Sequence, residues 1–484
     1  MNYIFSEFHL LLSAIIKNQN LETVCIPHEA TNFFSKLNID YLAGKESLQA
    51  FYQFSPDDKS LQEAISSREQ FPVNRKVLVD VLREQYKDLE ISDSVKTNID
   101  ALLQENTFTI TTAHQPNLMT GYLYFIYKIV HAAKLALHLK EQHRDKNLVP
   151  VFYIGSEDND LDELSVFRYN DTKYKWQTEQ TGAVGRMLTK DLQPLLKQLT
   201  SLLGPPGNNA EQLKEIILTA YKEPNTIAQA TRYIVNALLG QYGVVVLDAD
   251  NAQLKKQFLP VIKNELLQPQ SDRLVKNSSD ELSKSYGAQA FSRPINLFYL
   301  KDNLRERIEK DGEHWVVLKT EIKWNEAEIN AEIENHPERF SPNVILRGLY
   351  QETILPNVAF IGGGSEVAYW LQLKPVFDYY KVFYPAIILR QSVLWMNSNA
   401  VKLQAKLELT DEEIFQSTAQ LVNTYVSENT EKDLQVDDLR QQMLTTFDQI
   451  KKKATDIDIT LEASAAAALT KMCYQLDIIE KKMV

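Results

Sequence analysis

The stretch from residue 109 to residue 139 constrains the fold more than any other part of the chain. Its first part, TITTAHQPNLMTG (109–121), favours a β-strand followed by a polar loop, and its second part, 122–139, is an apolar run typical of a helix. Strand, loop and helix in this order form the unit of a parallel α/β sheet, which binds ligands where its strands end. His114, Gln115 and Asn117 would lie at such an end, so the sequence points first to an enzyme.

Four further short runs are rich in β-branched and aromatic residues and end in polar residues or glycine. They cover residues 149–154, 244–247, 358–361 and 384–389. Several of them are followed by helical patterns, so we expect an α/β fold with a parallel sheet.

The chain is long enough for more than one domain. We expect a core over residues 1–397, with less regular insertions near 165–230 and 265–340 that close over the sheet edge. From residue 398 onward glycine and proline are absent and charged residues are dense, which predicts a helical domain over 398–484.

That helical domain carries apolar residues in alternating steps of four and three, the seam of a coiled coil. The seam runs over Met443, Phe447, Ile450, Ala454, Ile457 and Leu461. It continues to Met483 only with an extra step of four after Leu461 and again after Met472. We expect a homodimer through this element; the alternative is a long helix packed on its own domain.

Composition excludes several classes of protein. The 484 residues include 52 basic and 64 acidic side chains, a formal charge of −12, which argues against nucleic acid or an anionic membrane as the main partner. Cys25 and Cys473 are too few for a disulfide framework or a cysteine zinc site. The N-terminus lacks the basic leader and cleavage site of a secreted protein, and no apolar run reaches the roughly 18 residues of a membrane helix. We therefore expect a cytoplasmic protein with no metal-ligand motif.

A dense acidic segment follows the predicted strand at 149–154. It places five carboxylates within seven residues: Glu157, Asp158, Asp160, Asp162 and Glu163. Such a group suits a protonated amine or a magnesium ion, because the carboxylates would otherwise repel one another. The alternative is an exposed helix start, where acidic side chains favour the helix dipole.

A triple glycine, 362–364, links the predicted strand at 358–361 to a helix that carries Glu366 and Tyr369. Consecutive glycines let the backbone approach an anion, and the N–H groups at the helix start can bind it. A tight structural turn is the alternative.

Arg347 and Arg390 each follow an apolar run, so we expect both to emerge at strand ends. Their guanidinium groups would suit a carboxylate or a phosphate. A buried ion pair with Glu157, Asp158 or Glu366 is the alternative for either arginine.

Several catalytic patterns are absent from the sequence. It contains no G-x-S-x-G elbow, no H-E-x-x-H motif and no cysteine beside a histidine. His131 and His138 lie seven residues apart on the predicted helix, and we expect ordinary surface residues there rather than ligands.

Four runs together resemble the family of the bacillithiol biosynthesis cysteine-adding enzyme. They are TTAHQPNLMTGYLYFIYKI (111–129), VPVFYIGSEDNDLDEL (149–164), SPNVILRGLYQETILPNVAFIGGGSEVAYWLQLKPVF (341–377) and PAIILRQS (385–392). The resemblance implies a Rossmann-like core with connecting insertions and a C-terminal coiled-coil domain that mediates dimerisation. It also implies a ligase (EC 6) that joins the carboxyl group of cysteine to the amine of glucosaminyl malate.

Amide formation from a carboxylate requires activation, for which ATP with Mg²⁺ is the simplest agent, and removal of a proton from the attacking amine. Our hypothesis places the activated cysteine near His114 and Asn117, and the amine near Glu157, Asp158 or Asp160. Arg347 and Arg390 would bind the malate carboxylates. The other residues expected to contact substrate are Gln115, Gly121, Gly362, Gly363, Gly364, Glu366 and Tyr369.

Two alternatives stay open: an ATP-dependent amide-forming or nucleotidyl-transferring enzyme with another acceptor, and a coiled-coil scaffold that binds a metabolite without turnover. Polar residues at several strand ends favour an enzyme. Asn159 stands where members of the family carry histidine, so no general base is expected there. The chain ends at Val484 within a helical pattern, whereas the family continues, which leaves a C-terminal truncation open.

Overall fold

The computed structural model describes residues 23–483 apart from 170–171, 205–206 and 430–436. The described residues divide into two compact units. One comprises residues 35–394, and the other comprises residues 23–34 together with 395–483.

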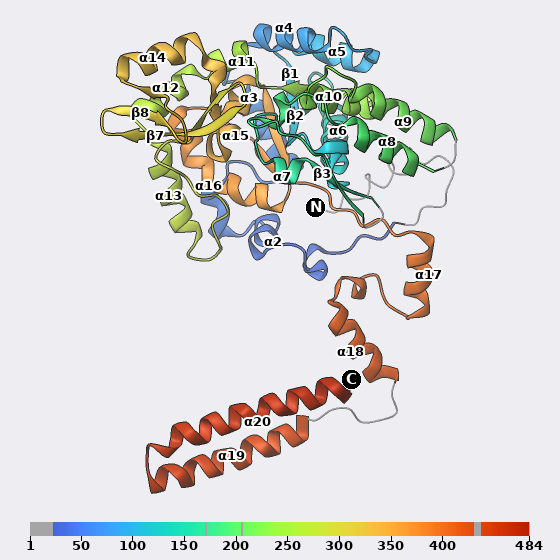
Figure 1. Cartoon of the computed structure of the whole chain (residues 1–484), viewed down its shortest axis with the longest axis vertical. Helices are drawn as coiled ribbons and strands as arrows, with labels where there is room; N and C mark the ends of the chain where they lie inside the picture. Colours follow the sequence, from blue (N-terminus) through green and yellow to red (C-terminus); the bar gives the residue numbers. More distant parts are fainter. Residues whose placement is uncertain (1–22, 170–171, 205–206, 430–436, 484) are drawn as a thin grey trace. The chain divides into compact units, whose positions relative to one another are not determined.

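Five parallel strands form the central sheet of the first unit, in the order β12-β11-β1-β2-β5 (Figure 1). They are β1 (Thr107–His114), β2 (Asn147–Ile154), β5 (Val245–Asp248), β11 (Asn357–Gly362) and β12 (Ala386–Leu389). The five predicted strands and the α/β class are therefore confirmed. The chain runs outward from β1 through β2 to β5 and then crosses back to place β11 on the other side of β1. The topological switch point, where ligands bind in open α/β sheets, lies between β1 and β11.

Helices cover both faces of this sheet. On one face α3 (Asp58–Arg68) and α6 (Tyr124–Gln142) bury a core that includes Phe108, Ile110 and Ile361. On the other face α15 (Val344–Ile354) and α16 (Gly364–Tyr380) pack on the sheet, and Trp370 lies against Phe360 with ring centroids 4.8 Å apart. Parallel strands are buried on both sides, which explains why they appear in the sequence as continuous apolar runs.

The segment before β1 is helical, and local capping sets where its helices start. Ser35, Asp57, Asn74 and Ser92 each accept a hydrogen bond from the backbone N–H three residues later. The elements are α2 (Lys36–Leu42), η2 (Glu46–Phe51), α3, α4 (Arg75–Tyr86) and α5 (Asp93–Ala101).

The two predicted insertions are more regular than the sequence suggested, because each buries a core of its own. The first packs its helices around Trp176, Leu196 and Tyr221. Its elements are α7 (Leu161–Leu164), β3 (Val166–Tyr169), β4 (Thr172–Lys175), η4 (Val184–Arg186), α8 (Gln193–Leu202), α9 (Asn208–Ala220), α10 (Ile227–Leu239) and η5 (Gly240–Tyr242).

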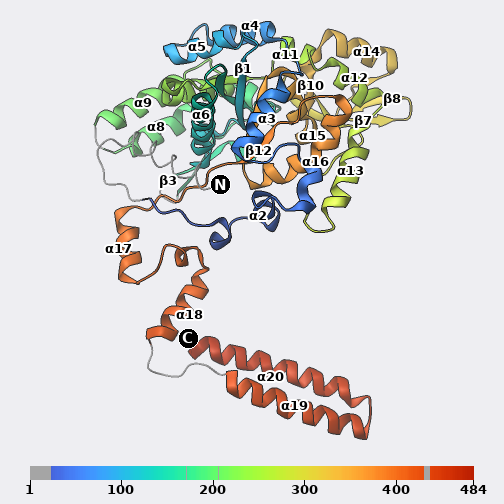
Figure 2. The same cartoon turned by 180° about the vertical axis from the view of Figure 1, so that it is seen from behind.

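The second insertion contains an antiparallel sheet of order β10-β6-β7-β8-β9. Figures 1 and 2 show this sheet on the opposite flank of the parallel sheet from α8 and α9. Its strands are β6 (Leu297–Lys301), β7 (Leu304–Asp311), β8 (His314–Val317), β9 (Lys323–Trp324) and β10 (Phe340–Pro342). The accompanying helices are α11 (Ala252–Lys256), α12 (Leu259–Leu267), α13 (Ser271–Leu282), α14 (Glu326–Asn335) and η6 (Pro337–Arg339).

The second unit is helical and ends in a two-helix hairpin, α19 (Asp437–Ile457) and α20 (Leu461–Met483), which lie side by side in both views. Ion pairs Arg440–Asp477 and Lys451–Glu462 join the two helices. The predicted continuous seam is therefore wrong: the chain reverses at residues 458–460, and Ile450, Ile457 and Leu461 of that seam are exposed. The remaining elements are η1 (His28–Thr31), α17 (Ser398–Lys406), η7 (Glu413–Phe415) and α18 (Thr418–Asn429). Among the described residues, no helix combines the length and apolarity needed to cross a bilayer.

Candidate functional site

Strand register brings three predicted site segments to the carboxyl edge of the sheet. His114 pairs with Ile154, and the Gly155 N–H donates to the His114 carbonyl at 2.7 Å. Gly362 pairs with Leu389, and the Arg390 N–H donates to the Gly362 carbonyl at 2.7 Å. The ends of β1 and β11 are neighbours, so His114, the glycine turn and Arg390 surround the switch point.

A buried ion pair spans this switch point. The Nζ of Lys128, on α6, donates to Oε2 of Glu366, on α16, and to the Ala113 carbonyl, both at 2.6 Å. The Lys128 side chain is 4% exposed and that of Glu366 is 25% exposed. Although burial alone would raise the pKa of Glu366, Lys128 and the Gly363 N–H hold that pKa below its usual range. Glu366 is therefore a carboxylate.

His114 is held as a neutral ring. Burial, with the charges of Lys128 and Arg390, lowers its pKa to about 3, and only Glu366 opposes the shift. Its Nδ1 accepts the Gln115 N–H at 2.8 Å, which leaves the proton of the neutral ring on Nε2. The ring stacks on Tyr124 with centroids 5.5 Å apart. His114 thus offers a fixed N–H donor at neutral pH.

The glycine turn lies between a carboxylate and a guanidinium. The Gly363 N–H donates to Glu366 Oε2 at 2.8 Å. A Cβ at Gly363 would lie 3.5 Å from both Glu366 Oε2 and Arg390 Nε. A Cβ at Gly362 would lie 2.8 Å from the Cβ of Glu366, and one at Gly364 would lie 2.6 Å from Asn38 Nδ2. The close approach of the Glu366 Cβ and the Phe360 ring therefore requires glycine at 362, whereas at 364 the end of the Asn38 side chain would have to move.

Arg390 follows β12 as expected, and its guanidinium lies over the Tyr124 ring at 5.0 Å. The following residue, Gln391, donates its N–H to His131 Nδ1 at 3.1 Å. His131 is 6% exposed, and burial lowers its pKa to about 4. The expectation of a surface residue at 131 is therefore wrong.

Arg347 does not emerge at a strand end. It lies within α15, because Asn343 accepts the Ile345 N–H and starts a helix where the apolar run suggested a strand. Its Nη2 donates to the Tyr369 hydroxyl at 2.9 Å and its Nη1 to Gln351 at 3.2 Å. Arg347 of α15 and Tyr369 of α16 are therefore in contact, and the guanidinium of Arg347 is already bonded to the side chains of Tyr369 and Gln351.

The loop after β1 is not the start of a helix. Met119, Thr120 and Gly121 all have positive φ, and α6 begins only at Tyr124. The helix thus starts two residues later than the apolar run 122–139 suggested. A Cβ at Gly121 would lie 3.0 Å from the Asn117 Cβ, so both its φ of +65° and this contact favour glycine. Asn117 is 6% exposed, and its Oδ1 has no hydrogen-bond partner within the described part of the chain.

Three of the five clustered carboxylates, Glu157, Asp158 and Asp160, have separate partners. Glu157 accepts a hydrogen bond from the fully buried Lys255 at 2.5 Å, and burial raises its pKa although Lys255 opposes the shift. Asp158 accepts the Gln115 Nε2–H at 2.7 Å. Asp160 caps α7 through the Glu163 N–H and is exposed. Asp158 alone of these residues links the acidic segment to the loop after β1.

Sequence reasoning missed three cations beside the predicted site residues: the buried Lys128 and Lys255, and the half-buried Arg305. One signal was available, because Lys128 falls within the apolar stripe of α6, between Phe125 and Ala132. Arg305 Nη1 donates to Asn159 Oδ1 at 3.0 Å. The two residues are 146 apart in the sequence, so no local sequence pattern predicts this contact.

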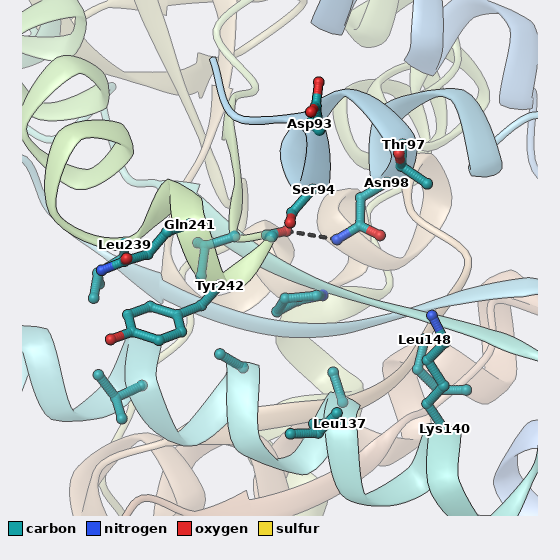
Figure 3. Close-up of a pocket in the computed structure, with 16 residues that line it drawn as sticks. Asp93, Ser94, Thr97, Asn98, Leu137, Lys140, Leu148, Leu239, Gln241 and Tyr242 are labelled. Atoms are coloured by element: carbon teal, nitrogen blue, oxygen red, sulfur yellow. Dashed lines mark hydrogen bonds between the residues drawn. The ribbon is translucent and has the colours of Figure 1, made fainter. Parts of the chain in front are cut away.

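The cavities in the described part of the first unit include two of similar volume. One of about 490 Å³, shown in Figure 3, is at the amino ends of the strands, between α5, α6 and η5. Leu137, Leu239 and Tyr242 line it, and Asn98 bonds the Gly243 carbonyl beside it, so it is far from the chemistry of the switch point. The other, of about 470 Å³, is lined by Asp158 and three arginines. Across the described residues, no three His, Cys, Asp or Glu side chains converge to hold a metal ion.

The doubly wound sheet, the charged groups at its switch point and the helical hairpin define a Rossmann-like domain followed by a coiled-coil domain. Family models agree: residues 21–391 match the N-terminal Rossmann-like domain of bacillithiol biosynthesis BshC, and residues 393–484 match its C-terminal coiled-coil domain. The chain belongs to the BshC family.

Its relatives include proteins named "Putative cysteine ligase BshC". That of Cytophaga hutchinsonii is 43% identical over 452 residues, which cover 93% of this chain and 84% of the relative. That of Flavobacterium psychrophilum is 40% identical over 467 residues, 96% of this chain and 88% of the relative. That of Bacillus cytotoxicus is 24% identical over 459 residues, 92% and 85% of the two chains.

Proposed function

We propose that the protein forms an amide bond between the carboxyl group of cysteine and the amine of glucosaminyl malate. Membership of the BshC family supports the reaction class. The observation that carries the proposal is the meeting of His114, Glu366 and Arg390 at the switch point, beside Asp158, which Gln115 holds. In this proposal His114 and Arg390 bind anionic groups, and Asp158 accepts a proton.

A free carboxylate does not react with an amine, so the proposal includes activation by ATP. A carboxylate oxygen of cysteine would attack ATP and release either ADP or pyrophosphate, so that the carboxyl carbon then carries a phosphate or adenylate leaving group. The acceptor amine then forms the C–N bond, the C–O bond to phosphate breaks, and the amine loses one proton.

The residues at the switch point would stabilise the negative charge of this reaction. The Nε2–H of His114 is a neutral donor, which stabilises an oxyanion without gaining a proton itself. Arg390 Nε lies 3.5 Å from the Cβ position of Gly363, and the start of α16 adds backbone N–H groups there. Glu366, which is paired with Lys128, accepts the Gly363 N–H and so holds the glycine turn in place.

Asp158 is the proposed general base for the acceptor amine. It faces the cavity of about 470 Å³, whereas Glu157 is engaged by Lys255 and Asp160 by α7. The Gln115 N–H···O bond keeps Asp158 oriented.

The test is a coupling assay with purified full chain, cysteine, glucosaminyl malate and ATP, with the product identified by mass spectrometry. We expect a product of the mass of the amide from the wild-type chain, and at least a hundredfold lower rate from Asp158→Asn with an unchanged thermal unfolding curve. Wild-type activity on another amine alone would favour a different acceptor. Binding without product under any condition would favour the scaffold alternative.

We further propose that the chain forms a homodimer through the α19–α20 hairpin. Several apolar side chains of the hairpin are exposed, among them Leu439, Ile450, Met472 and Ile479. A second copy would bury this surface.

A further inference from the structure

We propose that the cavity of about 470 Å³ beside Asp158 binds the dicarboxylate end of the acceptor. The inference rests on the proposed function for the identity of that acceptor. The residues that carry it are Asp158, Arg293, Phe298, Arg305, Arg307 and Asn343.

Three guanidinium groups converge on this cavity from the second insertion. Arg305 and Arg307 are alternate residues of β7 and so share one face of that strand, and Arg293 comes from the segment before β6. This concentration of positive charge is notable in a chain with a net charge of −12. Arginine is the side chain best suited to carboxylates, because its planar fork can form two parallel hydrogen bonds.

These arginines are largely available to a ligand. Within the described residues, no carboxylate oxygen lies within 4 Å of the Arg293 or Arg305 guanidinium, and the Arg307–Glu309 contact is long, at 3.8 Å. Arg305 is held in place by the Phe298 ring, 4.0 Å below its guanidinium, and by Asn159 and Ser341. It is therefore a preorganised cation.

The start of α15 adds to the positive potential. Asn343 and Val344 line the cavity at the N-terminus of this 11-residue helix, where the helix dipole is positive. Carboxylates are favoured at such a position.

Asp158 gives the cavity a negative end as well. One carboxylate opposite three guanidinium groups complements a ligand that carries an ammonium and two carboxylates. A polyphosphate lacks the ammonium and would face the charge of Asp158 directly. Glucosaminyl malate has the required amine and dicarboxylate, and its amine would then lie beside the proposed base.

The test is calorimetric titration of the full chain with glucosaminyl malate, with L-malate and with inorganic pyrophosphate, alongside the coupling assay. We expect Arg307→Gln to raise both the Kd and the KM for glucosaminyl malate by roughly tenfold, while the KM for cysteine is unchanged. Arg293→Gln, also on an exposed side chain, should act in the same direction. Lys301→Gln on β6 removes one charge from the same sheet but lies outside the cavity, and it should bind like wild type.

Binding and turnover separate the two proposals. If glucosaminyl malate binds with the expected arginine dependence but no amide forms, the cavity assignment stands and the proposed reaction fails. If amide forms and both arginine variants keep the wild-type KM for glucosaminyl malate, the cavity assignment is overturned. It is also overturned if pyrophosphate binds more tightly than L-malate and Arg307→Gln abolishes that binding, because the cavity then serves a polyphosphate.

Discussion

Lys128 and Glu366 lie 238 residues apart in the sequence, yet their Nζ and Oε2 atoms are 2.6 Å apart at the switch point of the sheet. The pair ties α6, on one face of the sheet, to α16 on the other. Because Lys128 also bonds the carbonyl of Ala113 in β1, it links the end of that strand to α16.

Replacement of Lys128 by Met should lower the free energy of unfolding by about 3 kcal/mol, since it leaves Glu366 as an unpaired, mostly buried carboxylate. The double variant Lys128→Met/Glu366→Gln should recover at least about 1 kcal/mol of that loss. Denaturant unfolding of the wild type, Lys128→Met, Glu366→Gln and the double variant measures the coupling energy between the two side chains. Additive effects would show that the two side chains do not interact.

His114 should make the fold less stable in mild acid. Its pKa falls from 6.5 in the unfolded chain to about 3 in the folded one, so between these values the unfolded chain binds the extra proton and stability falls as the pH is lowered. Between pH 7 and pH 5 this group should cost about 2 kcal/mol. His114→Asn, whose Oδ1 can accept the Gln115 N–H, should lose about that much less stability than wild type over the same range. Equal losses would contradict the low pKa.

Gly362→Ala should destabilise the fold by about 1–3 kcal/mol and lower coupling activity, because the new Cβ would lie 2.8 Å from the Glu366 Cβ and displace that side chain. Gly287→Ala is the matched control, since no heavy atom lies within 4 Å of its Cβ position. Thermal unfolding and the coupling assay measure both effects. An unfolding midpoint for Gly362→Ala equal to that of the control would argue against a close-packed turn.

The hairpin proposal predicts a particle of twice the 55.6 kDa chain mass by light scattering. Ile450→Glu with Met472→Glu should convert it to a monomer, because charges would then occupy an apolar interface. Val401→Glu places the same charge on an exposed apolar residue of α17, outside the hairpin, and should leave the dimer intact. A monomeric wild-type chain would refute the proposal.

The sequence was sufficient to predict the parallel sheet, because strands buried on both faces consist of short continuous apolar runs. It was insufficient to predict that Arg347 lies on a helix. The residues before that arginine are β-branched or leucine, and only the Asn343 cap shows that they start a helix. The hairpin turn was also hidden, because residues 458–460 contain neither glycine nor proline and close instead through the Asp458 carboxylate, which accepts the Thr460 N–H.

The candidate site was predictable only in part, for a related reason. His114, Glu366 and Arg390 each follow a recognisable strand, so their common edge could be inferred. Lys128 and Lys255 bind Glu366 and Glu157 from helices distant in sequence, and the arginine cavity combines β7 with the start of α15. Such contacts depend on tertiary packing, which no single segment encodes.

The antiparallel sheet is built from one continuous stretch, residues 297–342, and contributes no strand to the parallel sheet. It meets the edge of the parallel sheet through side chains, because Lys255 bonds both Glu157 and the Phe340 carbonyl and Arg305 bonds Asn159. Under the proposed cavity assignment, substitutions in β7 would change the choice of acceptor amine, while the switch point is formed by residues of other segments.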